Sequence, residues 1–132
     1  MIFVDTSFWI AFRNRRDARH PDALRLMEVH GDAGLITTNH VRGETWTYLR
    51  RRAGHRSAVG FLDALASSPR VAVDHVEPAM EDDATVWLRQ HDEREYSFVD
   101  ATSFAVMRRR RVRQAMAFDG DFSAAGFVEL RP

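Results

Sequence analysis

The chain has 132 residues, of which 45% are hydrophobic and 29% are charged, as is typical of one globular domain. It contains no cysteine, which excludes disulfides and thiolate metal sites and is compatible with the cytoplasm. The 19 basic residues are all arginine and balance 19 acidic residues, so the chain lacks the overall positive charge of many nucleic-acid-binding proteins.

The apolar N-terminal stretch, residues 1–12, carries Asp5 and no basic residue, so we do not expect a signal peptide. No apolar run is long enough to predict a membrane span. Without repeats, low-complexity segments or linkers, the sequence predicts a single domain over residues 1–132.

Short apolar runs alternate with helical patterns along the chain. The predicted strands are residues 2–4, 34–38, 70–75, 113–118 and 126–130. The predicted helices are residues 20–31, 40–54, 55–69, 77–96 and 97–111, with Asn39 capping the second and a helical turn after residue 118. This alternation predicts βαβ units, and therefore an α/β fold with three layers in which helices cover both faces of a parallel sheet.

Acidic residues follow two of the predicted strands. Asp5 comes directly after the first strand, and Asp119 and Asp121 come after the fourth. Helical spacing also turns Glu44 and Asp100 toward the less polar faces of their helices. Ligands of open α/β sheets bind beyond the carboxyl ends of the strands, so we expect these five acids to meet at one edge.

Each acid also has a purely structural explanation. Asp5 could cap the turn that follows it, and Asp100 could form a capping box with Ser97. Glu44 could complement a helix N-terminus, while Asp and Gly residues commonly form turns. Taken together, these explanations leave open why so many acids lean toward the same edge of the sheet.

Clustered carboxylates raise one another's pKa, and a divalent cation relieves that repulsion. An all-oxygen site suits Mg²⁺ or Mn²⁺, and the six histidines show no metal-ligand spacing. Receiver domains and haloacid-dehalogenase-type phosphatases also place Asp at strand ends, but they normally require a lysine. The P-loop, dinucleotide-binding and nucleophile-elbow motifs are absent. The pattern therefore favours a metal-dependent hydrolytic nuclease.

Four stretches resemble the successive motifs of PIN domains, and more narrowly those of VapC-type toxins. They are MIFVDTSFWIAF (1–12), VRGETWTYLRRR (41–52), SFVDATSFAVMRRRRV (97–112) and AMAFDGDFSAAGF (115–127), and the match runs to about residue 128. The resemblance implies a five-stranded parallel sheet of order 3-2-1-4-5 and Mg²⁺- or Mn²⁺-dependent cleavage of cellular RNA, such as tRNA or rRNA, which inhibits translation and growth. It also implies a homodimer and neutralisation by a VapB-type antitoxin.

The family's acidic residues carry over to Asp5, Glu44, Asp100 and Asp119 as the catalytic set, with Asp121 as a variable fifth acid. In the mechanism we expect, Asp5, Asp100 and Asp119 hold the ion directly or through waters, while Glu44 and Asp121 complete the cage or orient a water. In-line attack by water predicts products with a 3′-hydroxyl and a 5′-phosphate.

The chain departs from the family pattern beside the fourth acid. Ala117 stands where a threonine is usual, so a hydroxyl that would help to orient Asp119 is missing, and Gly120 makes the loop more flexible. Four hydroxyl residues lie next to the acids and could support them or cap local backbone instead: Thr6, Ser7, Thr102 and Ser103.

Two arginine clusters could contact RNA phosphates, or could complement helix dipoles at C-termini. They are Arg50, Arg51 and Arg52, and Arg108, Arg109, Arg110, Arg111 and Arg113. The aromatic residues Phe8, Trp9 and Phe12 could pack in the core or form a groove for an antitoxin helix.

Two alternatives remain open from the sequence. A catalytically weak PIN-like module would bind RNA or a partner without cutting; Ala117 supports this alternative and the intact acids oppose it. A structure-specific DNA nuclease of related fold usually carries added helical segments, for which 132 residues leave no room.

Overall fold

The computed structural model describes residues 1–132 in full. The strands are β1 (Ile2–Val4), β2 (Leu35–Thr38), β3 (Val71–Asp74), β4 (Gln114–Met116) and β5 (Val128–Glu129). The helices are α1 (Thr6–Arg13), α2 (His20–His30), α3 (Asn39–Arg52), α4 (His55–Ser67), α5 (Pro78–Gln90), α6 (Phe98–Arg110) and α7 (Asp121–Ala124). None of these helices combines the length and the apolar character needed to cross a bilayer.

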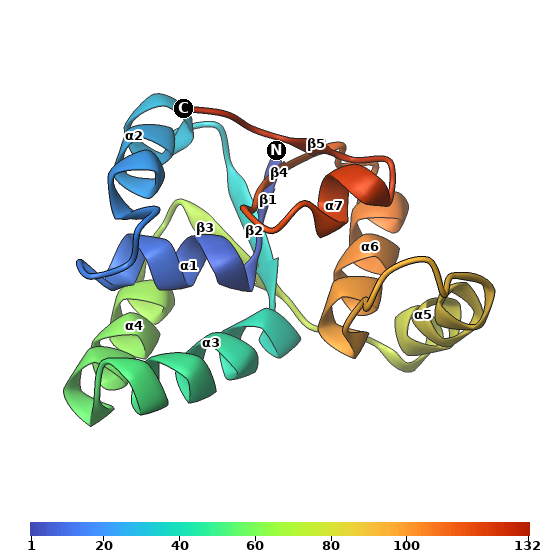
Figure 1. The fold of residues 1–132 in the computed structure, drawn as a ribbon, viewed down its shortest axis with the longest axis horizontal. Helices are drawn as coiled ribbons and strands as arrows, with labels where there is room; N and C mark the ends of the chain where they lie inside the picture. Colours follow the sequence, from blue (N-terminus) through green and yellow to red (C-terminus); the bar gives the residue numbers. More distant parts are fainter.

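The five strands form one parallel sheet in the order β3-β2-β1-β4-β5, which confirms the predicted topology. Helices α1 to α4 lie on one side of the sheet and α5 to α7 on the other (Figure 1). The sheet order changes direction at β1, because β2 lies on one side of it and β4 on the other. The carboxyl ends of β1 and β4 are therefore neighbours.

The core forms where the sheet meets both helical layers. All residues of β1 and β2 are buried, as expected for parallel strands covered on both faces. Phe3 of β1 stacks on Phe122 of α7 with ring centroids 5.8 Å apart, and Phe122 also meets Phe104 of α6. These rings fix α6 and α7 against the strands that carry the acids.

Two local predictions were wrong. Helix α5 ends at Gln90 rather than continuing to residue 96, because the chain turns back there and places Tyr96 against Trp87, with ring centroids 4.7 Å apart. The cap of α3 is Thr38, whose hydroxyl accepts from Val41 N (3.1 Å). Asn39 instead accepts a hydrogen bond from Val76 N (2.8 Å), which connects α3 to the segment after β3.

Candidate active site

The acids predicted from the sequence lie on segments that meet at the carboxyl edge of the sheet. Asp5 follows β1, and Asp119 and Asp121 follow β4, whose residue Met116 pairs with Val4. Asp100 belongs to the first turn of α6, which runs back from this edge. Pairing of β1 with β4 therefore places two acid-bearing segments, which carry three of the acids, side by side.

Asp5 is the most deeply buried of these acids, with 2% of its surface exposed. Its Oδ2 caps α1 by accepting hydrogen bonds from Ser7 N (3.1 Å) and Ser7 Oγ (2.7 Å). Burial, followed by the charges of Asp119 and Asp100, raises the pKa of Asp5 to about 8, against the lowering effect of the Ser7 hydrogen bonds. The ionised form of Asp5 is therefore costly unless a cation is nearby.

Asp100 is both a helix cap and a member of the charge cluster. It forms the capping box with Ser97, in which Asp100 Oδ2 accepts from Ser97 N (3.0 Å) and Asp100 N donates to Ser97 Oγ (2.9 Å). Burial raises the pKa of Asp100 to about 6, with further contributions from Asp121 and Asp119. The capping role and the electrostatic role considered from the sequence are thus both present.

Asp119 lies at the exposed rim of the site. Partial desolvation of its carboxylate, followed by the charge of Asp121, raises its pKa. The charges of Asp100, Asp119 and Asp121 each raise the pKa of at least one other aspartate, and the pKa of Asp5 is raised by Asp119 and Asp100. The four therefore form a single cluster of interacting carboxylates.

Ser7 connects the two strand ends that carry the acids. Its hydroxyl donates to Asp5 and accepts a hydrogen bond from Phe118 N (3.0 Å), immediately before Asp119. Ala117, which is fully buried, provides no side-chain hydroxyl here. Ser7 therefore supplies a hydroxyl contact to the segment in which the usual threonine is missing.

Glu129 of β5 holds the turn between Asp119 and Asp121, and the sequence analysis missed it. Its buried carboxylate accepts hydrogen bonds from Gly120 N (3.3 Å) and Ser123 N (2.9 Å). Gly120 has φ +83°, a left-handed conformation that favours glycine, so this glycine serves the turn itself. An acid within an otherwise apolar strand pattern, residues 126–130, was the available signal.

Arg94, in the segment between α5 and α6, is a second residue that sequence reasoning missed. Its guanidinium pairs with Asp121 Oδ1 through Nε (3.0 Å) and Nη2 (2.9 Å), and Nη2 also donates to Asp119 O (3.3 Å). A positive charge from another part of the chain therefore lies against the acid cluster. Nothing in the sequence spacing of Arg94, 25 residues before Asp119, indicated this contact.

Glu44 stands apart from the four aspartates in its contacts. It is half-buried on α3 and makes no hydrogen bond or ion pair. The start of α3 is nevertheless joined to α6, because His40 Nδ1 lies 3.2 Å from Thr102 Oγ1. The helix that carries Glu44 is thereby held beside the helix that carries Asp100.

The four hydroxyl residues differ in their hydrogen-bond partners. Only Ser7 bonds to an acid. Thr102 and Ser103 donate instead to Val99 O in their own helix (3.1 and 2.7 Å), the usual local bond of helical Ser and Thr and the alternative that the sequence left open for them. Thr6 Oγ1, next to Asp5 in the chain, is buried without any partner.

The two arginine clusters lie in different surroundings. Arg109 pairs with Asp83 (2.9 Å) and Arg110 with Asp74 (2.8 Å). The two arginines lie roughly 14 Å from Asp100 along the axis of α6. In the other cluster, Arg52 lies over the ring of Tyr48 at 5.0 Å, while Arg50 and Arg51 are exposed and make no ion pair. Arg111 and Arg113 are likewise exposed without an ion pair, so each cluster retains arginines that no acidic residue neutralises.

The donor atoms fit a hard divalent cation in chemistry. The four aspartates supply only oxygen atoms, which are the ligand type of Mg²⁺ and Mn²⁺. Their negative charges repel one another, and such an ion would neutralise these charges. No three carboxylates converge closely enough to coordinate one ion together, so an ion here would be held by one or two carboxylates and by waters.

The sheet order and the acids at its carboxyl edge define a class of α/β protein that the comparisons identify. A family model for the PIN domain matches residues 2–128, and the chain belongs to the PIN-domain family. It is similar to 23S rRNA-specific endonuclease VapC20 of Mycobacterium tuberculosis, in the strains CDC 1551 / Oshkosh and ATCC 25618 / H37Rv. Each is 60% identical over 132 residues, covering 100% of this chain and 99% of the relative.

A solved structure agrees with these relatives. The crystal structure of M. tuberculosis VapC20, described as a sarcin-ricin loop cleaving toxin, matches with a TM-score of 0.95 and 58% sequence identity over 100% of both chains. The resemblance to VapC-type toxins inferred from the four motifs is confirmed by these matches.

Proposed function

We propose that the chain, as a single domain, is a divalent-metal-dependent endoribonuclease toxin. The observation that carries this proposal is the cluster of Asp5, Asp100, Asp119 and Asp121, whose charges act on one another at the carboxyl edge of the sheet. Similarity to an RNA-cleaving endonuclease over the whole chain supports it. The site of action would be the cytoplasm, where its substrate is found.

In the proposed mechanism, Asp5, Asp100 and Asp119 would hold Mg²⁺ or Mn²⁺ directly or through waters. Ser7 fixes the Asp5 carboxylate by two hydrogen bonds, and Glu129 fixes the turn that presents Asp119 and Asp121. Glu44 and Asp121 would complete the cage or orient the attacking water. The bound ion would lower the pKa of that water and stabilise negative charge on the phosphate.

We propose ribosomal RNA as the substrate in preference to tRNA, because the relatives of known specificity act on 23S rRNA. The test is incubation of purified ribosomes, and separately of bulk tRNA, with the protein and Mn²⁺, followed by sequencing of fragment ends. We expect one dominant cut in 23S rRNA and intact tRNA. Specific cleavage of tRNA alone would transfer the substrate assignment to tRNA.

Arg94 gives a prediction about metal binding. Arg94→Gln is expected to bind Mn²⁺ roughly two- to fivefold more tightly, because it removes a positive charge from Asp121 and frees that carboxylate. Calorimetric titration measures the change. Arg89→Gln is the matched control, since Arg89 is exposed on α5 and makes no ion pair. Weaker binding by Arg94→Gln would mean that Arg94 holds Asp121 in its metal-binding position.

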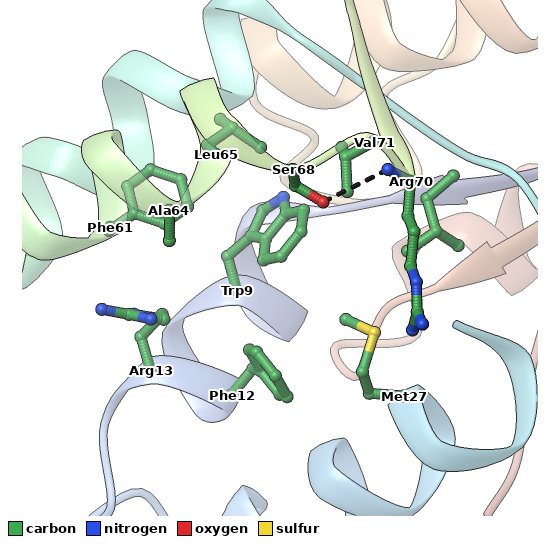
Figure 2. A pocket seen from close by; sticks show the side chains of 11 residues that line it. Trp9, Phe12, Arg13, Met27, Phe61, Ala64, Leu65, Ser68, Arg70 and Val71 are labelled. Atoms are coloured by element: carbon green, nitrogen blue, oxygen red, sulfur yellow. Dashed lines mark hydrogen bonds between the residues drawn. The ribbon is translucent and has the colours of Figure 1, made fainter. Parts of the chain in front are cut away.

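A VapB-type antitoxin is the proposed partner, and an apolar cleft formed by α1, α2 and α4 is its proposed docking site. Figure 2 shows Trp9 and Phe12 of α1 facing Met27 of α2 and Phe61 of α4 across this cleft. The indole Nε1 of Trp9 is buried without an acceptor. An amphipathic helix with acidic flanks would suit the apolar cleft and the arginines that line it.

Ala64→Arg tests this docking site, because Ala64 is exposed and lines the cleft. A bulky charge there is expected to weaken antitoxin binding at least about tenfold while leaving RNA cleavage unchanged. Binding is measured by surface plasmon resonance with the co-encoded antitoxin. Ala66→Arg, two residues away and outside the cleft, is the control. Unchanged affinity of Ala64→Arg would place the antitoxin elsewhere.

We also propose that the chain forms a homodimer, as VapC-type toxins are expected to do. Light scattering of the purified protein over a range of concentrations measures its mass directly. A mass of 15.2 kDa at all concentrations would contradict the proposal.

A further inference from the structure

A second cleft opens beside Asp119, and it is distinct from the apolar cleft of Figure 2. Its walls come from α1, from the segment between α1 and α2, from α3 and from the end of β4. The residues that matter here are Asp17, Arg19, Tyr48 and Phe118, in addition to Asp119 itself. Any molecule in this cleft would lie next to the acid cluster.

Arg19 presents a flat surface in this cleft. Its guanidinium carbon lies 4.4 Å from the centroid of the Phe118 ring, and its Nε pairs with Asp22 Oδ2 at 3.0 Å. These two contacts fix the plane of the guanidinium, and the side chain remains 42% exposed. Arginine planes and aromatic rings are the surfaces on which proteins stack unpaired RNA bases.

Tyr48 supplies a second ring from α3. Arg52 lies over this ring at 5.0 Å, and the Tyr48 hydroxyl makes no hydrogen bond within the chain. The cleft therefore contains the Arg19–Phe118 pair and a second aromatic ring, that of Tyr48. Stacking on such pairs tolerates any base, so selectivity must come from a polar group.

Asp17 is a polar group that could supply the selectivity. Its Oδ1 accepts a hydrogen bond from Arg19 N (2.8 Å), while Oδ2 makes no hydrogen bond or ion pair. A carboxylate oxygen repels a phosphate but accepts a hydrogen bond from the exocyclic amino group of cytosine, adenine or guanine. Uracil has no such amino group. At Asp17, the cleft therefore suits a base with an amino group better than a phosphate.

We propose that this cleft is a nucleobase subsite. It binds one unpaired base that carries an exocyclic amino group, from a nucleotide adjacent to the phosphate that is cut. The base stacks against Tyr48 and the Arg19 plane, and Asp17 Oδ2 accepts from its amino group. The inference rests on the proposed ribonuclease function and deepens it, because it assigns sequence selectivity to residues outside the acid cluster.

The test uses RNA hairpins with the sarcin–ricin loop sequence and single uridine replacements at each loop position. For the wild-type protein, uridine at one position next to the cut should lower kcat/KM roughly tenfold or more, since a hydrogen bond to a charged acceptor is lost. Asp17→Asn keeps the Oδ1 acceptor for Arg19 N and can also donate to uracil, so it should reduce this discrimination to about twofold. Tyr48→Leu should raise KM with kcat nearly unchanged.

Anisotropy titrations of the same hairpins, with Asp5→Asn as the background, read the subsite independently of cleavage. Arg89→Ala, on the far helical layer, is the control and should match wild type. If wild type and Asp17→Asn each bound all hairpins with equal affinity and cleaved them with equal kcat/KM, the subsite would be overturned and the ribonuclease proposal would remain intact. The subsite would also be overturned if Asp17→Asn lost only its inhibition by the antitoxin and discriminated among the hairpins as wild type does. Absence of cleavage by wild type would refute the ribonuclease, while the binding data would still decide the subsite.

Discussion

Replacing Asp5 by asparagine is expected to lower RNA cleavage roughly a thousandfold or more and to stabilise the metal-free protein at the same time. The loss of activity follows because Asp5 lies at the centre of the proposed metal site and a neutral amide neither attracts the ion nor offsets its charge. The gain in stability follows because Asp5 is buried among other acids and has a pKa raised to about 8. Asparagine retains one acceptor oxygen for Ser7 and is itself a favourable helix cap.

The stability gain should depend on pH in a defined direction. The pKa of Asp5 is higher in the folded state than its ordinary value of 3.8, so the folded protein holds the proton more tightly. The metal-free wild type should therefore lose stability as pH rises from about 4 to about 8, and Asp5→Asn should remove much of that loss. We expect the variant to melt roughly 3–10 °C above wild type at pH 8 and near wild type at pH 5, which corresponds to ~1–3 kcal/mol.

Differential scanning calorimetry in EDTA at the two pH values measures this effect. Asp82→Asn is the matched control, because Asp82 is exposed on α5 and forms no ion pair. If Asp5→Asn were inactive but less stable than wild type at pH 8, the main role of Asp5 would be to cap α1. Its buried charge would then not destabilise the metal-free protein.

Replacing Glu129 by alanine should produce the second large effect. Two backbone N–H groups, those of Gly120 and Ser123, would lose their carboxylate acceptor inside the protein. Hydrogen bonds to charged groups contribute roughly 1.5–3 kcal/mol each, so we expect a loss of ~2–4 kcal/mol in the free energy of unfolding. Because this turn presents Asp119 and Asp121, kcat/KM should fall roughly ten- to hundredfold even where the variant is folded.

Glu129→Gln provides the comparison for this prediction. The amide keeps an acceptor for one of the two N–H groups, so both losses should be about half those of alanine on the free-energy scale. Urea denaturation and cleavage kinetics measure the two quantities. If Glu129→Ala lost stability but cleaved RNA as wild type does, the turn would not depend on Glu129 for its active geometry.

The sequence predicted those parts of the site whose positions depend only on strand ends and helical spacing. Asp5 directly follows three apolar residues and Asp119 follows another apolar strand, so parallel pairing of these strands was sufficient to bring them together. Ser97 and Asp100 have the spacing of a capping box, and the structure contains it. The resemblance to PIN domains added the strand order, which spacing alone does not give.

Contacts between distant segments were beyond sequence reasoning. Arg94 reaches Asp121 only because the chain turns back after Gln90 to pack Tyr96 on Trp87. Glu129 reaches Gly120 because β5 pairs with β4 beyond a one-turn helix. In both cases, the position of a charged side chain depends on tertiary packing and not on the local pattern around it.

The arginine-rich segments show the same limit. Helical spacing could not distinguish Arg109 and Arg110, which pair with Asp83 and Asp74, from Arg50 and Arg51, which have no acidic partner. The two groups differ because α6 packs against α5 and the end of β3, which places Asp83 and Asp74 beside Arg109 and Arg110. Arg19, far from both clusters in the sequence, contributes to the cleft beside Asp119.

We propose above all that the acid cluster uses a divalent cation to hydrolyse RNA. The most direct test is cleavage of purified ribosomes by wild type and Asp5→Asn, each with Mn²⁺ or EDTA, with the chemistry of the new ends determined by end-labelling. We predict fragments only for wild type with Mn²⁺, ending in a 3′-hydroxyl and a 5′-phosphate. Cleavage that persists in EDTA or in Asp5→Asn, or that leaves a cyclic phosphate, would contradict the claim. Intact RNA under all four conditions, with antitoxin removed, would favour a PIN domain that binds without cutting.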